Sequence, residues 1–386
     1  MSEPWYNGYI RNRSKEFPGT ISGKDTERGF SVKLIHCADF HLDSPMESNL
    51  PPEKAKERRA ELRSVFSRMV DFAVKEEVSV ILIAGDLFDR DRVTKSTRQY
   101  VLDTIAAHPA IRFFYLSGNH DRSVLPEDPE SLPRNLYTFA DGWTTYPLEE
   151  NISVIGSEAP DADTFSVSPD RFNILLLHGQ VRTGSGTAKE GIIRLGKLKG
   201  SHVDYVAMGH VHEYREYRID ARTVACYCGC PEGRGFDECG TRGIVLLEVR
   251  DGKETHRLIP FAKRTMHCIS CDLTGLLSQT ELEERVSALT EGIPPQDAVK
   301  VVLCGSCPPD FVKDPEHLQS LLSERFYFSL VRDESRLLID PAQYRNDISL
   351  KGEFVRTVLS SSLSEEEKER VLSCGLRALR GEEVGL

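Results

Sequence analysis

The chain lacks any long apolar run. Across its 386 residues, no stretch approaches the roughly 20 apolar residues that a membrane-spanning helix requires. Residues 1–31 are polar and charged and contain glycine, so we expect no secretory signal there and interpret them as a flexible N-terminal extension. We therefore expect a cytoplasmic protein with no membrane partner.

The chain also lacks an excess of positive charge. It has 49 Lys and Arg against 60 Asp and Glu residues, for a net charge of −11. Such a chain does not attract a polyanion at long range, so DNA binding would need a local basic surface. Six basic residues between 54 and 68 lie on a helix with an apolar stripe, which favours a solvated face. Arg90, Arg92 and Lys95 are the other candidates, as contacts to DNA phosphates.

Cysteine, by contrast, is present ten times. Free thiols without a secretion signal favour a reducing cytosol. The pairs Cys268/Cys271 and Cys304/Cys307 resemble zinc knuckles. However, their separation is long for a zinc ribbon, and both pairs lie in or beside strand-like runs whose alternate residues point to opposite faces. We do not predict zinc there.

Five short polar motifs each follow a largely apolar run of the kind found in fully buried strands. If these strands share a sheet direction, their polar ends converge on one edge, where open α/β folds place their sites. The motifs are Asp39–His41, Gly85–Asp89, Gly118–Asp121, His178–Gly179 and Gly209–His212.

The chemistry of these motifs indicates a pair of metal ions. Two divalent ions about 3.5–4 Å apart can hold a phosphate between them, and a carboxylate best spans both. Asp86 is the candidate bridge. Imidazole mixed with carboxylate and amide oxygen suits manganese, iron or zinc better than calcium or magnesium. Of these we expect two manganese ions, with iron or zinc as alternatives.

On these motifs the chain resembles the calcineurin-like metallophosphoesterases, and within them the SbcD/YhaO-type DNA repair exonucleases. The stretches His36–Pro45 and Tyr227–Glu238 carry the resemblance to the nuclease branch. The resemblance implies that Asp39, His41, Asp86 and His212 hold one ion. It implies that Asp86, Asn119, His178 and His210 hold the other.

The resemblance also implies a role for His120. This residue would be the catalytic residue. It would face the scissile phosphate and assist the attack of a hydroxide activated by the two ions, because imidazole can donate a proton near neutral pH. Asp89 and Asp121 are candidates to support His120 or a ligand by a hydrogen bond. Asp89 stands where some relatives have a histidine, and with Arg90 it resembles a protein phosphatase motif, which keeps a phosphatase as an alternative.

The order of elements predicts an α+β fold. Together with the resemblance, it predicts a four-layer α/β/β/α sandwich with a small α/β cap and C-terminal helices. We expect the nuclease domain at 32–262, the cap at 263–348 and a helical segment at 349–386. The last helices either dock on their own chain or bind a partner.

The function we expect is a metal-dependent phosphodiesterase, a DNA exonuclease subunit that processes double-strand ends in an SbcCD-like complex. Its partners would be DNA and an SMC-like ATPase, with a homodimer as a further candidate. One alternative is a phosphomonoesterase or cyclic-nucleotide phosphodiesterase on the same scaffold. The other is a DNA-end-binding scaffold subunit with weak catalysis.

Overall fold

The protein is described by a computed structural model. It describes residues 31–46, 50–89, 93–122, 124–126, 128–148, 151–159, 167–182, 191–309, 311–379 and 381. Arg90, Arg92 and the predicted extension up to residue 30 lie outside these ranges. Among the described residues, we find no helix with the length and apolarity that a membrane span needs.

The first large sheet has six strands in the order β14-β13-β1-β2-β3-β4. The strands β1 to β4 run parallel, and β13 and β14 are antiparallel additions at one edge. Their bounds are β1 (Ser31–Cys37), β2 (Val80–Ala84), β3 (Arg112–Leu116), β4 (Leu136–Thr138), β13 (Gly243–Arg250) and β14 (Lys253–Pro260).

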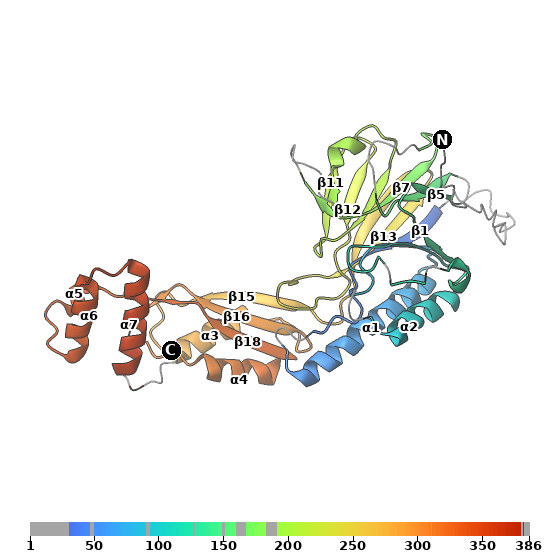
Figure 1. Ribbon diagram of the computed structural model, residues 1–386. Coiled ribbons are helices and arrows are strands. Elements are labelled where there is room, and N and C mark those ends of the chain that lie inside the picture. The colour runs from blue at the N-terminus through green and yellow to red at the C-terminus, as the bar shows by residue number, and fades with distance from the viewer. Residues whose placement is uncertain are drawn as a thin grey trace, which may run out of the picture.

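The second large sheet also has six strands, in the order β11-β12-β10-β7-β6-β5, with β6, β7, β10 and β12 parallel. The two sheets pack face to face (Figure 1), so Leu34 and Phe114 of one share a core with Leu176 and Ala207 of the other. Burial on both faces explains the continuous apolar runs. The bounds are β5 (Thr144–Pro147), β6 (Ile152–Gly156), β7 (Phe172–His178), β10 (Tyr205–Gly209), β11 (Arg215–Arg218) and β12 (Val224–Tyr227).

Helices α1 (Pro52–Lys75) and α2 (Lys95–Ala106) cover the outer face of the first sheet (Figure 1). The apolar stripe of α1 packs Phe66 and Met69 against Ile81 and Phe113 of the sheet. The second sheet is covered outside by the short 3-10 helix η3 (Leu195–Leu198) and the ribbon of β8 (Gln180–Val181) and β9 (Ile192–Ile193). A further 3-10 helix, η2, spans Pro129–Ser131. The predicted α+β sandwich is confirmed.

A smaller parallel sheet extends beyond the N-terminal end of α1 (Figure 1). It contains β15 (Met266–Asp272), β16 (Ala298–Cys304) and β18 (Phe328–Asp333), and α3 (Gln279–Leu289) and α4 (Pro315–Arg325) share its core. We call residues 266–337 the three-stranded unit; it includes the short pair β17 (Ser306–Cys307) and β19 (Arg336–Leu337).

The C-terminal helices lie at the far end of the three-stranded unit (Figure 1). They are α5 (Pro341–Tyr344), α6 (Leu350–Ser360) and α7 (Glu365–Leu379). Val355 and Val358 of α6 pack against Leu372 and Leu376 of α7, so these helices bury their apolar stripes on their own chain. A capping box begins α7, since Ser364 N donates to Glu367 and Glu367 N donates back to Ser364 Oγ.

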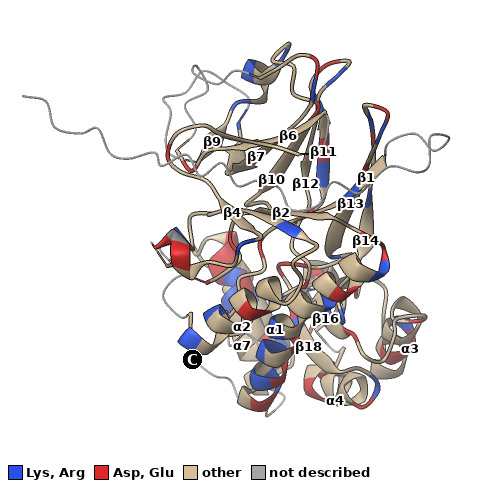
Figure 2. Cartoon of the chain, turned by 90° about the vertical axis from the view of Figure 1, so that its right-hand side faces the viewer, with Lys and Arg blue, Asp and Glu red and all other residues tan. Residues whose placement is uncertain are grey.

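One of the six basic residues between 54 and 68, Arg58, is buried and not solvated, which corrects the sequence interpretation for this residue. Acidic and basic residues are interleaved along α1 (Figure 2). Arg58 is fully buried, and its guanidinium donates to Glu61 at 2.5 Å and Glu232 at 3.0 Å. Arg264 donates to Glu61 at 2.7 Å. We call Arg58, Glu61, Glu232 and Arg264 the α1 ion cluster. Arg264 also donates to the carbonyl oxygen of Gln296 at 2.8 Å, so the cluster links α1 to the three-stranded unit.

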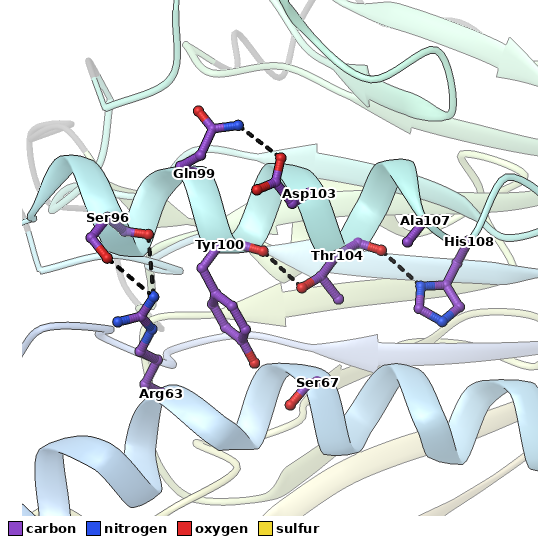
Figure 3. A pocket seen from close by; sticks show the side chains of 9 residues that line it. All are labelled: Arg63, Ser67, Ser96, Gln99, Tyr100, Asp103, Thr104, Ala107 and His108. Atoms are coloured by element: carbon purple, nitrogen blue, oxygen red, sulfur yellow. Dashed lines mark hydrogen bonds between the residues drawn. The ribbon is translucent and has the colours of Figure 1, made fainter.

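A surface hollow of about 650 Å³ lies between α1 and α2 (Figure 3). Arg63 of α1 lies over the ring of Tyr100 at 4.7 Å and donates to Ser96, so the hollow is bounded by contacts that hold the two helices together. None of the predicted metal ligands lines it. The candidate site lies elsewhere, at the carboxyl ends of the strands.

Candidate metal centre

The predicted ligands follow strands that are neighbours in the two sheets. Asp39, Asp86 and Asn119 come after β1, β2 and β3, which lie side by side in the first sheet. His178 ends β7, and His210 follows the adjacent β10 in the second sheet. Because these strands are parallel, their carboxyl ends meet along one edge of each sheet, and the two edges face each other.

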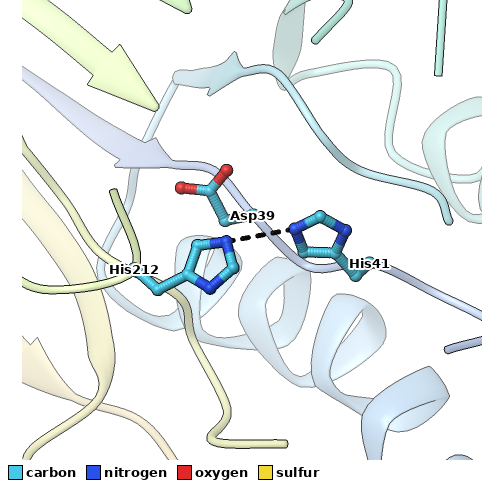
Figure 4. A group of neighbouring side chains, drawn as sticks. All are labelled: Asp39, His41 and His212. Atoms are coloured by element: carbon cyan, nitrogen blue, oxygen red, sulfur yellow. Dashed lines mark hydrogen bonds between the residues drawn. The ribbon is translucent and has the colours of Figure 1, made fainter. Parts of the chain in front are cut away.

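Two groups of ligand atoms lie close enough to hold a metal ion each. In the first group, the ligand atoms of Asp39, His41 and His212 lie within 4.8 Å of one another (Figure 4). The second group, Asp86, His178 and His210, has the same spacing. The structure thus brings together residues up to about 170 positions apart in the chain (His41 and His212 are separated by 171).

Asp86 lies between the two groups. Its Oδ2 atom is 3.8 Å from His41 Nε2 and 3.3 Å from His178 Nε2. Asn119 completes the second group, because its Oδ1 atom is 3.0 Å from His178 Nε2 and 3.3 Å from His210 Nδ1. A carboxylate in this position can contribute to both ions, as a bridge must.

Hydrogen bonds behind the histidines fix which nitrogen faces the centre. His178 Nδ1 is 2.9 Å from the carbonyl oxygen of Ala84, and His212 Nδ1 is 2.7 Å from Glu238 Oε1. Both partners accept, so each Nδ1 donates a hydrogen and each Nε2 is the nitrogen that faces the centre. His212 Nε2 lies 3.2 Å from His41 Nε2 (Figure 4). Imidazole and carboxylate donors aimed at shared points fit divalent metal ions.

The backbone at the ligands adopts a conformation that most residues avoid. The φ angles are +54° at Asp39, +47° at His41, +51° at Asp86 and +99° at His210. Such non-glycine residues persist only where surrounding contacts hold them, and they cluster at functional sites. Here His210 N donates to both carboxylate oxygens of Asp39 at 3.0 Å, which ties two of these residues together.

Glycine is required at two positions beside the ligands. A Cβ atom on Gly118 would lie 2.1 Å from Asp86 Oδ1, and one on Gly85 would lie 2.2 Å from His178 Nδ1. Gly85 also has a φ of +92°. Any side chain at these positions would push a ligand out of place.

Residues 32–214 match the family described as calcineurin-like phosphoesterase. This segment is a calcineurin-like metallophosphoesterase domain. The family is a hydrolase family with a dinuclear divalent metal site, and the two ligand groups provide the candidates for it. The resemblance predicted from the sequence is confirmed.

The metallophosphoesterase domain has named relatives. The chain is 28% identical over 338 residues to the uncharacterized metallophosphoesterase YhaO of Bacillus subtilis, covering 78% of this chain and 81% of that protein. It is 26% identical to the DNA double-strand break repair protein Mre11 of Saccharolobus solfataricus, covering 56% and 60%. It is 23% identical to the SbcD component of the nuclease SbcCD of Bacillus subtilis, covering 58% and 68%.

Burial sets the electrostatics of the metallophosphoesterase centre. Burial raises the pKa of Asp39 to about 7 and lowers the pKa of His41 to about 2. Burial also opposes the protonation of His178, but the hydrogen bond and charge of Asp86 outweigh it and raise the pKa of His178 to about 9. The carboxylates thus lie in a poorly solvated place that favours added positive charge, which divalent cations supply.

His120 differs from the ligands in its surroundings. Its side chain is 43% exposed, and its Nδ1 atom is 3.5 Å from Asp89 Oδ1. It also lies near His41 and Asp86, with a ligand-like spacing to both. Its backbone N donates to Asp86 Oδ1 at 2.9 Å, so His120 and Asp86 are held relative to each other.

The other predicted supporting residues have distinct positions. The buried Asp121 carboxylate accepts backbone N–H groups from Gly118 at 2.6 Å and Leu87 at 2.7 Å, so it joins the turns after β2 and β3. Asp89 faces His120. Lys95 is exposed at the first residue of α2.

Sequence reasoning gave no role to Glu238 and Arg234, which lie directly behind His212. Glu238 is the partner of His212 Nδ1, and Arg234 Nη2 donates to Glu238 Oε1 at 2.7 Å. Both residues belong to the stretch Tyr227–Glu238, which carried the family resemblance without a stated role. His212 and Glu238 are 26 residues apart, with β11 and β12 between them, and no sequence spacing predicts a contact at that separation.

The cysteines have no place in the metal centre. All ten are free. Cys268 is exposed while Cys271 is buried on the same strand, β15. Among the described residues, the groups with metal-ligand spacing contain only Asp and His.

Proposed function

We propose that the chain is a metal-dependent phosphodiesterase that processes the ends of double-stranded DNA. It would act as the exonuclease subunit of an SbcCD-like complex, with an SMC-like ATPase as partner. The single observation that carries the chemistry is the position of the Asp86 carboxylate, whose Oδ2 atom is 3.8 Å from His41 Nε2 of the first group and 3.3 Å from His178 Nε2 of the second, with the partly exposed imidazole of His120 beside it. The choice of DNA is supported by the similarity to Mre11 and to the SbcD component of the nuclease SbcCD.

The proposed ligand sets follow the two groups. Asp39, His41, Asp86 and His212 would hold one ion, and Asp86, Asn119, His178 and His210 the other. Bound there, two divalent ions, with manganese as our first choice, supply positive charge against the phosphate and lower the pKa of water. The supporting distances are those between Asp86 and the imidazoles of both groups.

His120 is the proposed catalytic residue. With Nδ1–H directed toward Asp89, the ring presents Nε2 to the substrate. When protonated, this nitrogen can hand its proton to the leaving oxygen of the phosphodiester. Asp89, whose Oδ1 atom is 3.5 Å from His120 Nδ1, fixes the orientation of the ring. Removal of such a group typically lowers the rate by about 10²–10⁴-fold.

The proposed DNA contacts are Arg90, Arg92 and Lys95, of which Lys95 is described and begins α2. Two basic residues of α1 have partners within the chain: Arg58 in the α1 ion cluster, and Lys54 over the ring of Tyr327 at 3.9 Å. Lys95 is exposed, and we propose it with Arg90 and Arg92 as a contact to DNA phosphates, which positions the duplex without reading its sequence.

A side-by-side assay tests this function. Purified protein with manganese is given a labelled linear duplex and p-nitrophenyl phosphate in parallel. We expect degradation of the duplex, and we expect His120→Ala to abolish it while bound manganese is retained. His317→Ala is the matched control, because His317 is an exposed histidine on α4.

Two other outcomes would reject the assignment. Hydrolysis of p-nitrophenyl phosphate but of no DNA, with or without an ATPase partner, supports a phosphomonoesterase or cyclic-nucleotide phosphodiesterase. Binding of DNA ends without cleavage supports a scaffold role. The motif of Asp86, Asp89 and Arg90 is the feature that keeps the first alternative in view.

A further inference from the structure

The loop at residues 230–242 wraps the rear of His212. Within it, the Glu238 side chain is only 4% exposed. Its Oε1 atom accepts from His212 Nδ1 at 2.7 Å and from Arg234 Nη2 at 2.7 Å, and its Oε2 atom accepts from the Arg234 backbone N at 2.7 Å. Arg242 holds the loop from behind, since its Nε donates to the Glu238 carbonyl oxygen at 3.0 Å and its guanidinium to the His212 carbonyl oxygen.

Two groups of opposite character face the same ring nitrogen. His212 Nδ1 is 2.7 Å from the Glu238 carboxylate and 3.2 Å from Arg234 Nη2. An ionised carboxylate can only accept a hydrogen bond, whereas a guanidinium can only donate one. Glu238 therefore requires hydrogen on Nδ1, and Arg234 requires a lone pair there. The carboxylate is the nearer of the two.

We propose that Glu238 is a positioning residue that imposes the Nδ1–H tautomer on His212 against the competing donor Arg234. The proposal rests on the proposed metal centre, because its purpose is to keep the Nε2 lone pair directed toward Asp39 and His41. Glu238 at the same time holds the Arg234 guanidinium by its Nη2 and Nε atoms, at 2.7 Å and 3.1 Å from Oε1. Glu238 thus takes one of the two Nη2 hydrogens and keeps the guanidinium directed mainly toward its own carboxylate.

Loss of Glu238 then has a consequence that depends on Arg234. Without the carboxylate, Arg234 Nη2 can donate to His212 Nδ1, which moves the ring hydrogen to Nε2. That nitrogen faces His41 Nε2 at 3.2 Å, and a protonated nitrogen cannot ligate a metal ion. Removing Arg234 as well takes away the competing donor, so the double variant should recover metal binding that the single variant loses.

Two measurements on the metal-free and metal-titrated protein test this. Long-range proton–nitrogen NMR spectra of ¹⁵N-histidine-labelled, metal-free protein report which nitrogen of His212 carries hydrogen. We expect Nδ1–H in the natural chain and in Glu238→Gln, Nε2–H in Glu238→Ala, and a mixture of tautomers in Glu238→Ala/Arg234→Met. Glu254→Gln is the matched control. Glu254 also accepts a hydrogen bond from a histidine, His256 Nδ1, at a distance of 2.9 Å, but this pair is not part of the centre.

Calorimetric titration with Mn²⁺ alone gives the second readout. For one of the two ions, Glu238→Ala should lose about 10–100-fold in affinity, the usual effect of removing such a partner of a ligating histidine. The double variant should recover part of this loss, and the control should not change. Glu238→Gln keeps an acceptor in place and should bind nearly as the natural chain, which guards against a folding defect in Glu238→Ala.

The outcomes are separable. An Nε2–H tautomer in the natural chain, or a double variant that binds Mn²⁺ no better than Glu238→Ala, overturns the inference and leaves Glu238 with a packing role only. If the tautomers and affinities behave as expected but no phosphodiester is cleaved, the proposed function fails and the inference stands.

Discussion

Replacement of Arg58 by methionine tests the α1 ion cluster most directly. Arg58 is fully buried and donates to Glu61, to Glu232 and to the carbonyl oxygen of Gly233 at 2.7 Å. Methionine keeps much of the buried stem but removes every one of these donors. Breaking a buried ion pair on one side costs roughly 3–5 kcal/mol, because the partner charge stays buried.

The structure places the expected loss at the lower end of that range. Glu61 keeps Arg264 at 2.7 Å, and Glu232 keeps the backbone N–H of Lys263 at 2.8 Å. The Nε atom of Arg58 has no partner among the described residues, so the cluster is already incompletely satisfied. We therefore expect Arg58→Met to lower the free energy of unfolding by about 3 kcal/mol.

Urea unfolding followed by circular dichroism measures this change. Lys56→Met is the matched control: Lys56 lies on the same helix and is exposed, so its replacement should stay within about 0.5 kcal/mol of the natural chain. If Arg58→Met lowers the free energy of unfolding by less than about 1 kcal/mol and the control is unchanged, the reasoning is refuted. The ion pairs of Arg58 would then contribute no more than those on the protein surface.

Three further predictions follow from the centre and the cluster. Gly118→Ala places a Cβ atom 2.1 Å from Asp86 Oδ1, so it should weaken Mn²⁺ binding in calorimetry; Gly142→Ala, whose Cβ meets nothing within 4 Å, should not. Burial opposes ionisation of Glu61, but hydrogen bonds from Arg264, Lys263 and Arg58 lower its pKa to about 2. The ionised Glu61 therefore contributes fully to the free energy of unfolding above pH 4.5, and this contribution is lost as the pH falls toward 2. In urea unfolding, Glu61→Gln should reduce the dependence of the free energy of unfolding on pH in this range. An unchanged dependence would contradict the lowered pKa. Chelation by EDTA should abolish hydrolysis, and Mn²⁺ should restore it; activity that persists in metal-free protein would exclude the two-ion centre.

The sequence was a good guide where structure follows from local pattern. The run Val80–Ile83 is apolar throughout and forms β2, a strand buried along its whole length. Asp86 and His178 were expected at one edge because each follows such a run, and their side chains lie 3.3 Å apart. Residue type and order were therefore enough to predict which side chains gather at this edge, because parallel strands bring their carboxyl ends together.

The sequence was a poor guide where a long side chain had two possible environments. Arg58 precedes Leu62 by four residues and Val65 by seven, so the helical period places its charge on the apolar face of α1, where it is fully buried. Its partner Glu232 is 174 residues away. A charge is buried only where opposite charges and hydrogen bonds meet it, and a helical pattern does not include partners from distant segments.

The sequence by itself determined the buried strands, the polar motifs at their ends and membership of residues 32–214 in the metallophosphoesterase family. These depend on periodicity and residue chemistry within short windows. Only the tertiary structure decided that Glu238 and Arg234 both face His212, and that the α1 charges join two parts of the chain. The physical reason is the same in both cases. Hydrogen bonds act over about 3 Å, so their energy depends on which distant residues the fold brings into contact.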